Sequence, residues 1–236
     1  MIPKKIHYIW LGEKSKSNFI NSCIVTWKEH MPDYEIIEWN ENNLDIEKLC
    51  NENRFFKECY KREMYAFMAD YIRLKVLYEN GGIYFDTDIQ VLKSFDEFLD
   101  KKFVIGFEKE NLISAGVICA EPHNSTIKKI LNFYDEEIWS KPIYVIPDII
   151  TYCIQDNIDE ICIFPREYFY PFYYDEMFSI SCIKKNTYTI HWWAASWHEK
   201  KYTVFLNTKH INNPIKRKLV YLKKIIGYYY RKLLNK

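Results

Sequence analysis

Glycine is scarce in this chain of 236 residues. There are six glycines, and none belongs to a G-x-G-x-x-G or G-x-x-x-x-G-K pattern. Such patterns place backbone N–H groups around a phosphate at the start of a helix. A glycine-rich phosphate loop is therefore not expected, and a metal ion becomes the natural partner for any phosphate that the protein recognises.

Long apolar runs and paired cysteine motifs are also missing. No uncharged apolar stretch approaches the roughly 20 residues that a membrane-spanning helix needs, and the first six residues lack the basic-then-apolar order of a signal peptide. Seven cysteines are scattered without a C-x-x-C pair, which favours buried thiols in a reducing compartment over disulfides or a zinc site. We therefore expect the chain on the cytoplasmic side of the membrane.

Acidic residues are absent from the end of the chain. From Pro214 onward there are eight basic residues and no acidic one, although the net charge of the whole chain is only +1. Apolar residues recur there at helical spacing, at Ile215, Leu219, Leu222, Ile226, Tyr229 and Leu233. We expect a catalytic domain over 1–210 and a basic amphipathic tail over 211–236 that lies on an anionic membrane surface. A solvated helix or a dimer contact is the alternative, and the acidic body argues against nucleic acid as a partner.

Hydrophobic patterning indicates alternating strands and helices. Strands are expected at 2–10, 34–39, 82–86, 103–107, 116–120, 161–164 and 188–193. Helices are expected at 18–30, over 45–78 in two or three pieces, at 125–139 and at 148–155. This alternation predicts a three-layer α/β fold around a largely parallel sheet.

The most informative stretch runs from Asp70 to Asp88. A helix is expected to stop near Asn80, because Gly81 suits the residue that follows a helix, and a short strand then leads to Asp86. In an extended segment Asp86 and Asp88 leave on the same side, so both can face one divalent cation. Carboxylates suit Mn²⁺ or Mg²⁺, which keep water and substrate phosphates as their other ligands. The Asp-x-Asp spacing by itself is common in ordinary loops, so its context decides.

Three segments in order resemble one known family. The middle segment comprises Ala69-Asp70-Tyr-Ile-Arg73, Leu77-Tyr78 and Gly81-Gly82-Ile-Tyr-Phe-Asp86-Thr-Asp88. It resembles the signature of the DXD sugar-binding glycosyltransferases, a group that includes initiating mannosyltransferases and bacterial capsule enzymes and is related to the large glucosylating toxins. The opening strand, which ends at Trp10-Leu11-Gly12, and the closing His191 with Ser196-Trp197 resemble the same family.

The resemblance implies a GT-A fold with a Rossmann-like sheet, a nucleotide-sugar donor, a divalent cation and transfer with retention of configuration. Asp70 and Arg73 match the pair that contacts the donor sugar and diphosphate. Asp88 matches the direct metal ligand, and Asp86 the partner that holds ribose, sugar or metal-bound water.

The resemblance, together with the residue types themselves, suggests further residues around the donor. Trp10, with Leu11 beside it, matches a position that stacks on the nucleotide base, and Trp39-Asn40 is a weaker candidate for the far edge of that site. His191 suits Mn²⁺ as a further ligand, Ser196 and Trp197 suit the β-phosphate, and His198 is an alternative to His191. Asn111, Ser114 and Gly116 are expected in a polar loop that lets a sugar ring approach the backbone.

Each of these residues also has an ordinary structural interpretation. Asp70 and Arg73 are three residues apart on a helix and can form a surface ion pair worth under about 1 kcal/mol. Trp10 and His191 can be core side chains, and His7 is expected to be structural. The loop at Asn111 can equally be a strand-entry turn.

The sequence therefore predicts a metal-dependent, retaining hexosyltransferase that uses a nucleotide-sugar, with UDP favoured over GDP. The expected acceptor is a glycan or lipid-linked oligosaccharide in capsular or cell-surface polysaccharide synthesis, at the inner face of the membrane. One alternative is a metal-dependent phosphatase of the haloacid-dehalogenase type, although such enzymes usually carry their Asp-x-Asp on the first strand. Another is a non-catalytic module that binds sugar nucleotides or glycans.

Overall fold

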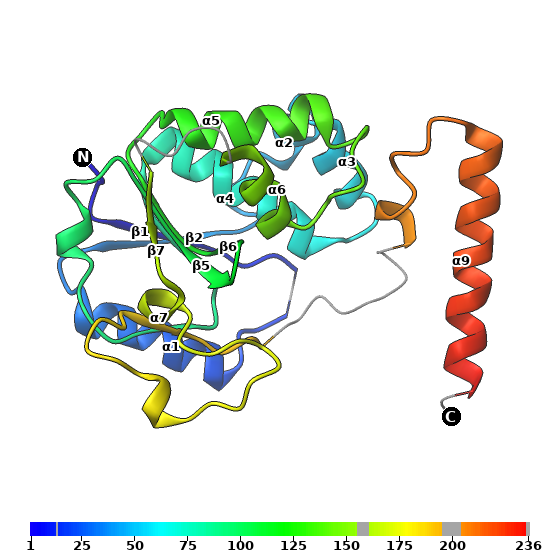
Figure 1. Ribbon diagram of the computed structural model, residues 1–236. Coiled ribbons are helices and arrows are strands. Elements are labelled where there is room, and N and C mark those ends of the chain that lie inside the picture. Colours follow the sequence, from blue (N-terminus) through cyan, green and yellow to red (C-terminus); the bar gives the residue numbers. More distant parts are fainter. Residues whose placement is uncertain (13, 155–160, 195–203, 235–236) are drawn as a thin grey trace.

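The computed structural model describes residues 1–12, 14–154, 161–194 and 204–234, with the backbone alone at 228, 229 and 231–234. Figure 1 shows a layered α/β body and a long C-terminal helix beside it. The first half comprises β1 (Lys5–Ile9), α1 (Asn18–His30), β2 (Glu35–Trp39), α2 (Ile46–Glu52), α3 (Arg54–Tyr60), α4 (Tyr65–Asn80), β3 (Gly82–Phe85), β4 (Ile89–Val91) and the 3₁₀ helix η1 (Asp96–Phe98). The second half comprises β5 (Phe103–Lys109), β6 (Leu112–Ala120), α5 (Ser125–Asn132), the π-helical turn η2 (Phe133–Glu137), α6 (Ile146–Ile154), β7 (Cys162–Phe164), α7 (Arg166–Phe169), the 3₁₀ helix η3 (Ile180–Cys182), β8 (Thr189–His191) and α9 (Pro214–Leu234).

The central sheet has six strands in the order β2-β1-β3-β6-β5-β7. β2, β1 and β3 are parallel neighbours, β6 runs against β3 and β5, and β7 is parallel to β5. Five strands thus point one way and β6 points the other. The predicted three-layer fold with a largely parallel sheet is confirmed.

Side-chain alternation along the strands separates two cores. In β3, Tyr84 joins the core beneath helices α2 to α6, whereas Ile83 and Phe85 join the core that α1, α7 and Tyr188 cover. Successive strand residues point to opposite faces, so a fully buried strand feeds both layers. Figure 1 shows these two helical layers on either side of the sheet.

The turn between α4 and β3 depends on two glycines. Gly81 has a φ of +62°, and a Cβ there would lie 2.6 Å from Cδ of Pro122. Gly82 has a φ of +106°, and its Cβ would lie 2.7 Å from the carbonyl oxygen of Lys5. Positive φ and close approach both require glycine. The expected end of the helix at Asn80 is confirmed, and the close packing joins α4 tightly to the sheet.

Three expected elements differ from the structure. The helix expected over 125–139 is α-helical only to Asn132 and then widens into η2. The strand expected at 188–193 is shortened to β8 and lies outside the main sheet, where it pairs with β4. The prediction of a polar loop that contains Ser114 and Gly116 is wrong, because both residues belong to β6. Only Asn111 lies in the turn before this strand, with a φ of +60°. For β6 and β8, pairing with distant strands overrode the local pattern.

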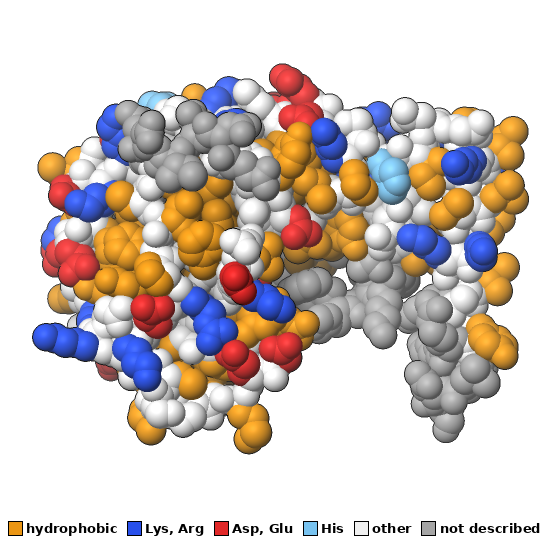
Figure 2. Space-filling view, in the orientation of Figure 1, with side chains coloured by type: hydrophobic (Ala, Val, Ile, Leu, Met, Phe, Trp, Pro, Cys, Tyr) orange, Lys and Arg blue, Asp and Glu red, His pale blue; other side chains and the backbone are white. Residues whose placement is uncertain are grey.

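The tail forms the expected helix, α9, whose division from the body remains a prediction. Ile215, Leu219 and Ile226 are exposed, while the side chains of Tyr229 and Leu233 lie outside the description. Figure 2 shows apolar and basic side chains along this helix. Within the described residues no helix combines the length and apolar character needed to cross a membrane, and all seven cysteines are free thiols.

Candidate functional site

The Asp86-Thr87-Asp88 segment lies at the carboxyl edge of the sheet and forms a turn. The backbone N–H of Asp86 donates to the carbonyl of Gly116 at 2.8 Å, and the N–H of Ile89 donates back to the carbonyl of Asp86 at 3.0 Å. The strand therefore stops at Phe85, one residue earlier than expected, and the assumption of an extended Asp-x-Asp segment is wrong. Because of the turn, each carboxylate has its own set of partners.

Asp86 is held by a buried arginine. Arg73 contacts Oδ1 of Asp86 through Nη1 at 3.1 Å and Oδ1 of Asp70 through Nη2 at 2.8 Å. Its Nη1 also donates to the carbonyl of Ala115 at 2.8 Å, and its guanidinium lies 4.5 Å from the centroid of the Tyr84 ring. The Tyr84 hydroxyl donates to Asp86 at 2.9 Å. Arg73 thereby connects α4, the Asp-x-Asp turn and β6.

The Asp70–Arg73 pair is not a surface ion pair, since the two residues are only 8% and 6% exposed. Burial, with a smaller contribution from Asp86, raises the pKa of Asp70 to about 7, although Arg73 opposes the shift. Neighbouring carboxylates raise the pKa of Arg73 despite its burial. Arg73 therefore stays charged, and removing it would leave buried carboxylates without their counter-ion.

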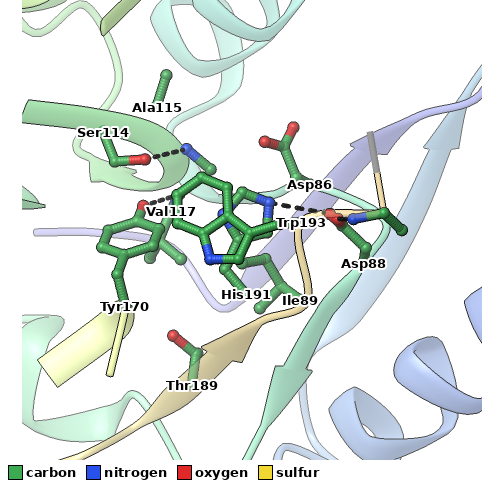
Figure 3. A network of polar contacts seen from close by, with 12 residues as sticks. Asp86, Asp88, Ile89, Ser114, Ala115, Val117, Tyr170, Thr189, His191 and Trp193 are labelled. Atoms are coloured by element: carbon green, nitrogen blue, oxygen red, sulfur yellow. Dashed lines mark hydrogen bonds and ion pairs between the residues drawn. The ribbon is translucent and has the colours of Figure 1, made fainter. Parts of the chain in front are cut away.

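Asp88 is joined to His191 by the small sheet. β4 and β8 pair antiparallel with Ile89 opposite His191, which brings Nε2 of His191 to 3.2 Å from Oδ1 of Asp88. The other oxygen, Oδ2, accepts the N–H of Ala194 at 2.8 Å. Figure 3 shows both contacts converging on Asp88.

The electrostatics of this pair favour its charged form. Burial alone would raise the pKa of Asp88, but His191 and the N–H of Ala194 lower it below its usual value. Burial likewise would lower the pKa of His191, but Asp88, Asp86 and Glu108 raise it. The carboxylates around this imidazole favour a positive charge at this position, which the proton on His191 supplies and which a bound cation would supply in its place, with His191 then neutral.

Trp193 covers the imidazole of His191. The two ring centroids are 4.0 Å apart, and the indole N–H donates to the carbonyl of Phe172 at 3.0 Å. Figure 3 shows the indole across the His191 ring. Trp193 has a φ of +53°, a costly conformation for an aromatic residue. Sequence reasoning missed Trp193 as a site residue, because the run Thr-Ile-His-Trp-Trp reads as a continuous strand.

Gly116 provides the space into which Asp86 and His191 fit. A Cβ at this position would lie 3.1 Å from Oδ2 of Asp86 and 3.5 Å from both Cε1 of His191 and Cε1 of Tyr170. One residue of β5, Gly106, here lies opposite four residues of β6, because Ile105 pairs with Ile118 and Phe107 with Ile113. This bulge turns Gly116 toward the site, as bulges near active sites often do.

Glu108 is a second residue that sequence reasoning missed. It is 7% exposed, and burial raises its pKa while a hydrogen bond from Ser114 opposes the shift. Its charge acts on both His191 and Asp86. In the sequence it stands within Glu-Lys-Glu-Asn, which resembles a solvated charge cluster, so no local pattern distinguished it.

Trp10 lies one residue beyond β1, as Asp86 lies one residue beyond β3. The two strands are parallel neighbours, so both residues lie at one edge of the sheet. Trp10 is half-buried, its indole N–H donates to the carbonyl of Lys14 at 2.8 Å, and Nζ of Lys16 lies 5.5 Å from the ring centroid. Leu11 beside it packs against the core under α4.

Trp39 is already engaged with His7. Its indole N–H donates to Nδ1 of His7 at 3.1 Å, and Nε2 of His7 contacts the carbonyl of Gly81 at 2.8 Å. Because Nδ1 accepts, the proton of the neutral imidazole belongs on Nε2, which donates to Gly81. These contacts give His7 the structural position that the sequence predicted. Ser196, Trp197 and His198 lie outside the described residues.

The donor set at this edge fits a divalent cation. Asp88 offers a carboxylate and His191 an imidazole whose Nε2 faces that carboxylate, whereas Nδ1 of His191 points away from Asp88 and is buried without a hydrogen-bond partner in the described structure. Among the described residues no group of three or more His, Cys, Asp or Glu side chains is arranged to hold a metal. Substrate oxygens or water would have to complete the coordination shell, as is usual for Mg²⁺ with phosphates.

Comparison with known proteins points to the same family that the sequence motifs resemble. Residues 17–104 match the model of the family described as glycosyltransferase sugar-binding region containing DXD motif. Inositol phosphoceramide mannosyltransferase 3 of Schizosaccharomyces pombe is 30% identical over 102 residues, 42% of this chain and 27% of that protein. The initiation-specific alpha-1,6-mannosyltransferase of Candida albicans is 30% identical over 115 residues, 46% of this chain and 30% of that protein. The chain thus spans less than a third of the length of these curated relatives.

Among solved structures, the PaToxG glycosyltransferase superposes with a TM-score of 0.52 and 21% identity, covering 66% of this chain and 69% of that chain. This likeness concerns the fold, and it confirms the GT-A architecture. The resemblance to the DXD glycosyltransferases is confirmed.

Proposed function

We propose that this chain, which has the sugar-binding region of the DXD glycosyltransferases at residues 17–104, transfers a sugar from a nucleotide-sugar to a glycan or lipid-linked oligosaccharide. The observation that supports this proposal best is the contact of Asp88 with His191, next to Asp86, which Arg73 holds in place. The donor is a UDP-sugar in preference to a GDP-sugar, and transfer retains the anomeric configuration. The product belongs to capsular or other cell-surface polysaccharide synthesis.

In this proposal Asp88 and His191 hold Mn²⁺ or Mg²⁺, with Asp86 beside them. The bound cation neutralises negative charge on the leaving nucleoside diphosphate. Asp86 accepts hydrogen bonds from hydroxyl groups of the donor, and its carboxylate is fixed for this task by Arg73 and Tyr84. Asp70 acts through Arg73, because its carboxylate is buried against that guanidinium.

The remaining donor contacts are proposed from position and resemblance. Trp10, with Leu11, receives the nucleotide base at the edge where β1 and β3 end, and stacking of a base on an aromatic ring contributes roughly 1–3 kcal/mol. Ser196 and Trp197 donate hydrogen bonds to the diphosphate. The proposed acceptor brings the enzyme to the inner membrane surface, where the exposed apolar and basic residues of α9 bind.

The experiment is a panel of UDP- and GDP-sugars with and without Mn²⁺, read by thermal shift and by donor hydrolysis. A UDP-sugar is expected to raise the melting temperature only with the metal, and Asp88→Asn is expected to lower hydrolysis about 10²–10³-fold. Asp100→Asn, an exposed carboxylate remote from the site in sequence, is the matched control. Nuclear magnetic resonance of the transferred sugar reports retention or inversion.

The outcomes separate the candidate functions. If no nucleotide-sugar stabilises the protein with metal, and Asp88→Asn changes nothing, the transferase proposal fails. Donor binding without hydrolysis or transfer would instead support a non-catalytic binding module. Release of inorganic phosphate from a phosphomonoester, abolished by Asp88→Asn, would support the phosphatase.

A further inference from the structure

A cavity of about 430 Å³ lies between the body and α9, built from residues that the proposed transfer does not use. One wall comes from α3 and the residues that follow it, and the other from α9. Its lining combines basic and aromatic side chains, among them Arg54, Arg62, Trp139, Phe205, Arg217 and Lys218.

Two arginines of the cavity stack on aromatic rings. The guanidinium carbon of Arg54 lies 4.4 Å from the centroid of Trp139, and that of Arg62 lies 4.0 Å from the centroid of Phe205. Stacking fixes the plane of a guanidinium while leaving its N–H edge available. Arg62 uses part of that edge on Glu58, whereas Arg54 has no ion-pair partner among the described residues.

The positive charge of the cavity is not balanced. Glu58 is the acidic residue in its lining, and it already pairs with Lys61 and Arg62. In the described part of the chain Arg217 and Lys218 make no ion pair either. Lys209 also lines the cavity, but its ammonium group donates to the carbonyls of Ile138, Lys141 and Ile143. These contacts give Lys209 a structural role.

We propose that this cavity binds the phosphate group of an anionic lipid. The edges of guanidinium groups match the oxygens of phosphate and bind them more selectively than a diffuse positive surface does. A lipid is favoured over a soluble ester because α9, which forms one wall, exposes an apolar row at Ile215, Leu219 and Ile226, where acyl chains can lie. Figure 2 shows that apolar and basic groups both line α9. Only the membrane part of the proposed function is assumed here.

The test compares two kinds of phosphatidylcholine vesicle of equal surface charge. One contains phosphatidic acid and the other a fatty acid, whose carboxylate has no phosphate. The full chain is expected to bind the phosphatidic acid vesicles more tightly. Arg54→Gln is expected to remove this preference. Because Arg54 lies on the body and not on the tail, this effect would locate the phosphate in the cavity. Arg54→Lys, which keeps the charge but not the planar fork, should restore it only in part.

Two pairs of substitutions on α9 provide the matched control. Arg217→Gln with Lys218→Gln removes two charges that line the cavity, and Lys223→Gln with Lys224→Gln removes two charges outside its lining. Both pairs should weaken binding to either vesicle, by about fivefold for each charge. Only the first pair should also abolish the preference for phosphatidic acid.

The proposal is overturned if Arg54→Gln keeps the full preference, or if the two α9 pairs behave alike. Inorganic phosphate is the further probe. If it stabilises the wild type but not Arg54→Gln, and also displaces the protein from the vesicles, the cavity binds a soluble phosphate and the lipid proposal is wrong. Donor hydrolysis without vesicles is expected to be unchanged in Arg54→Gln. Absence of hydrolysis in the wild type would therefore count against the transferase and leave the lipid site untouched.

Discussion

The substitution His7→Gln tests how the protein maintains the turn that leads into its Asp-x-Asp segment. His7 is completely buried, and its Nδ1 must accept from Trp39 while its Nε2 donates to Gly81. Protonation would set the new N–H of Nδ1 against the N–H of Trp39. Burial is the main cause that lowers the pKa of His7 to about 4, with a small further decrease from Lys5 and opposition from Gly81 and Glu35.

The expected magnitude follows from linkage. The unfolded chain takes up a proton on His7 below a pKa of 6.5, whereas the folded protein does so only near 4. The stabilisation is therefore present above pH 6.5, decreases as the pH falls through the interval, and changes no further below about 4. A shift of this size corresponds to about 3.4 kcal/mol in full and to about 2 kcal/mol by about pH 5.

The assay is urea unfolding of wild type and His7→Gln at about pH 7.5 and about pH 5. Glutamine retains an acceptor for Trp39 and a donor for Gly81 but does not titrate. Between the two pH values, His7→Gln should therefore lose about 2 kcal/mol less of its free energy of unfolding than the wild type. His30→Gln, a substitution of the same type at the exposed end of α1, is the matched control. Equal losses in wild type and His7→Gln would refute the reasoning.

Three further substitutions test the site. Arg73→Met should destabilise the fold by about 3–5 kcal/mol in urea unfolding, because Asp70 and Asp86 would lose their buried counter-ion; a change below about 1 kcal/mol would contradict this. Gly116→Ala should leave the melting temperature nearly unchanged but weaken metal-dependent donor binding, since its Cβ would crowd Asp86, and unaltered donor affinity would argue against that contact. Gly81→Ala should lower stability by about 1–3 kcal/mol, because its φ of +62° and a proline ring 2.6 Å away both oppose a side chain.

The sequence by itself determined the features that depend on neighbouring residues. The spacing of α4, the glycine stop at Gly81 and the strand before Asp86 are local, since helix periodicity and φ preferences act over a few residues. The alternation of elements was likewise enough to predict three layers and a largely parallel sheet. Three ordered motifs carried the family resemblance, and the match over residues 17–104 includes the middle one, from Ala69 to Asp88.

Only the tertiary structure decided which distant groups meet. The pairing of β4 with β8 brings His191 to Asp88, although about a hundred residues separate them, and the bulge in β6 places Gly116 against Asp86. The choice of a strand's partner depends on packing between remote segments, which the period of two along a strand does not encode. Arg73 illustrates both levels. Its helical spacing from Asp70 could be seen in the sequence. Its buried ion pair with Asp86 follows from the close packing of α4 on the sheet.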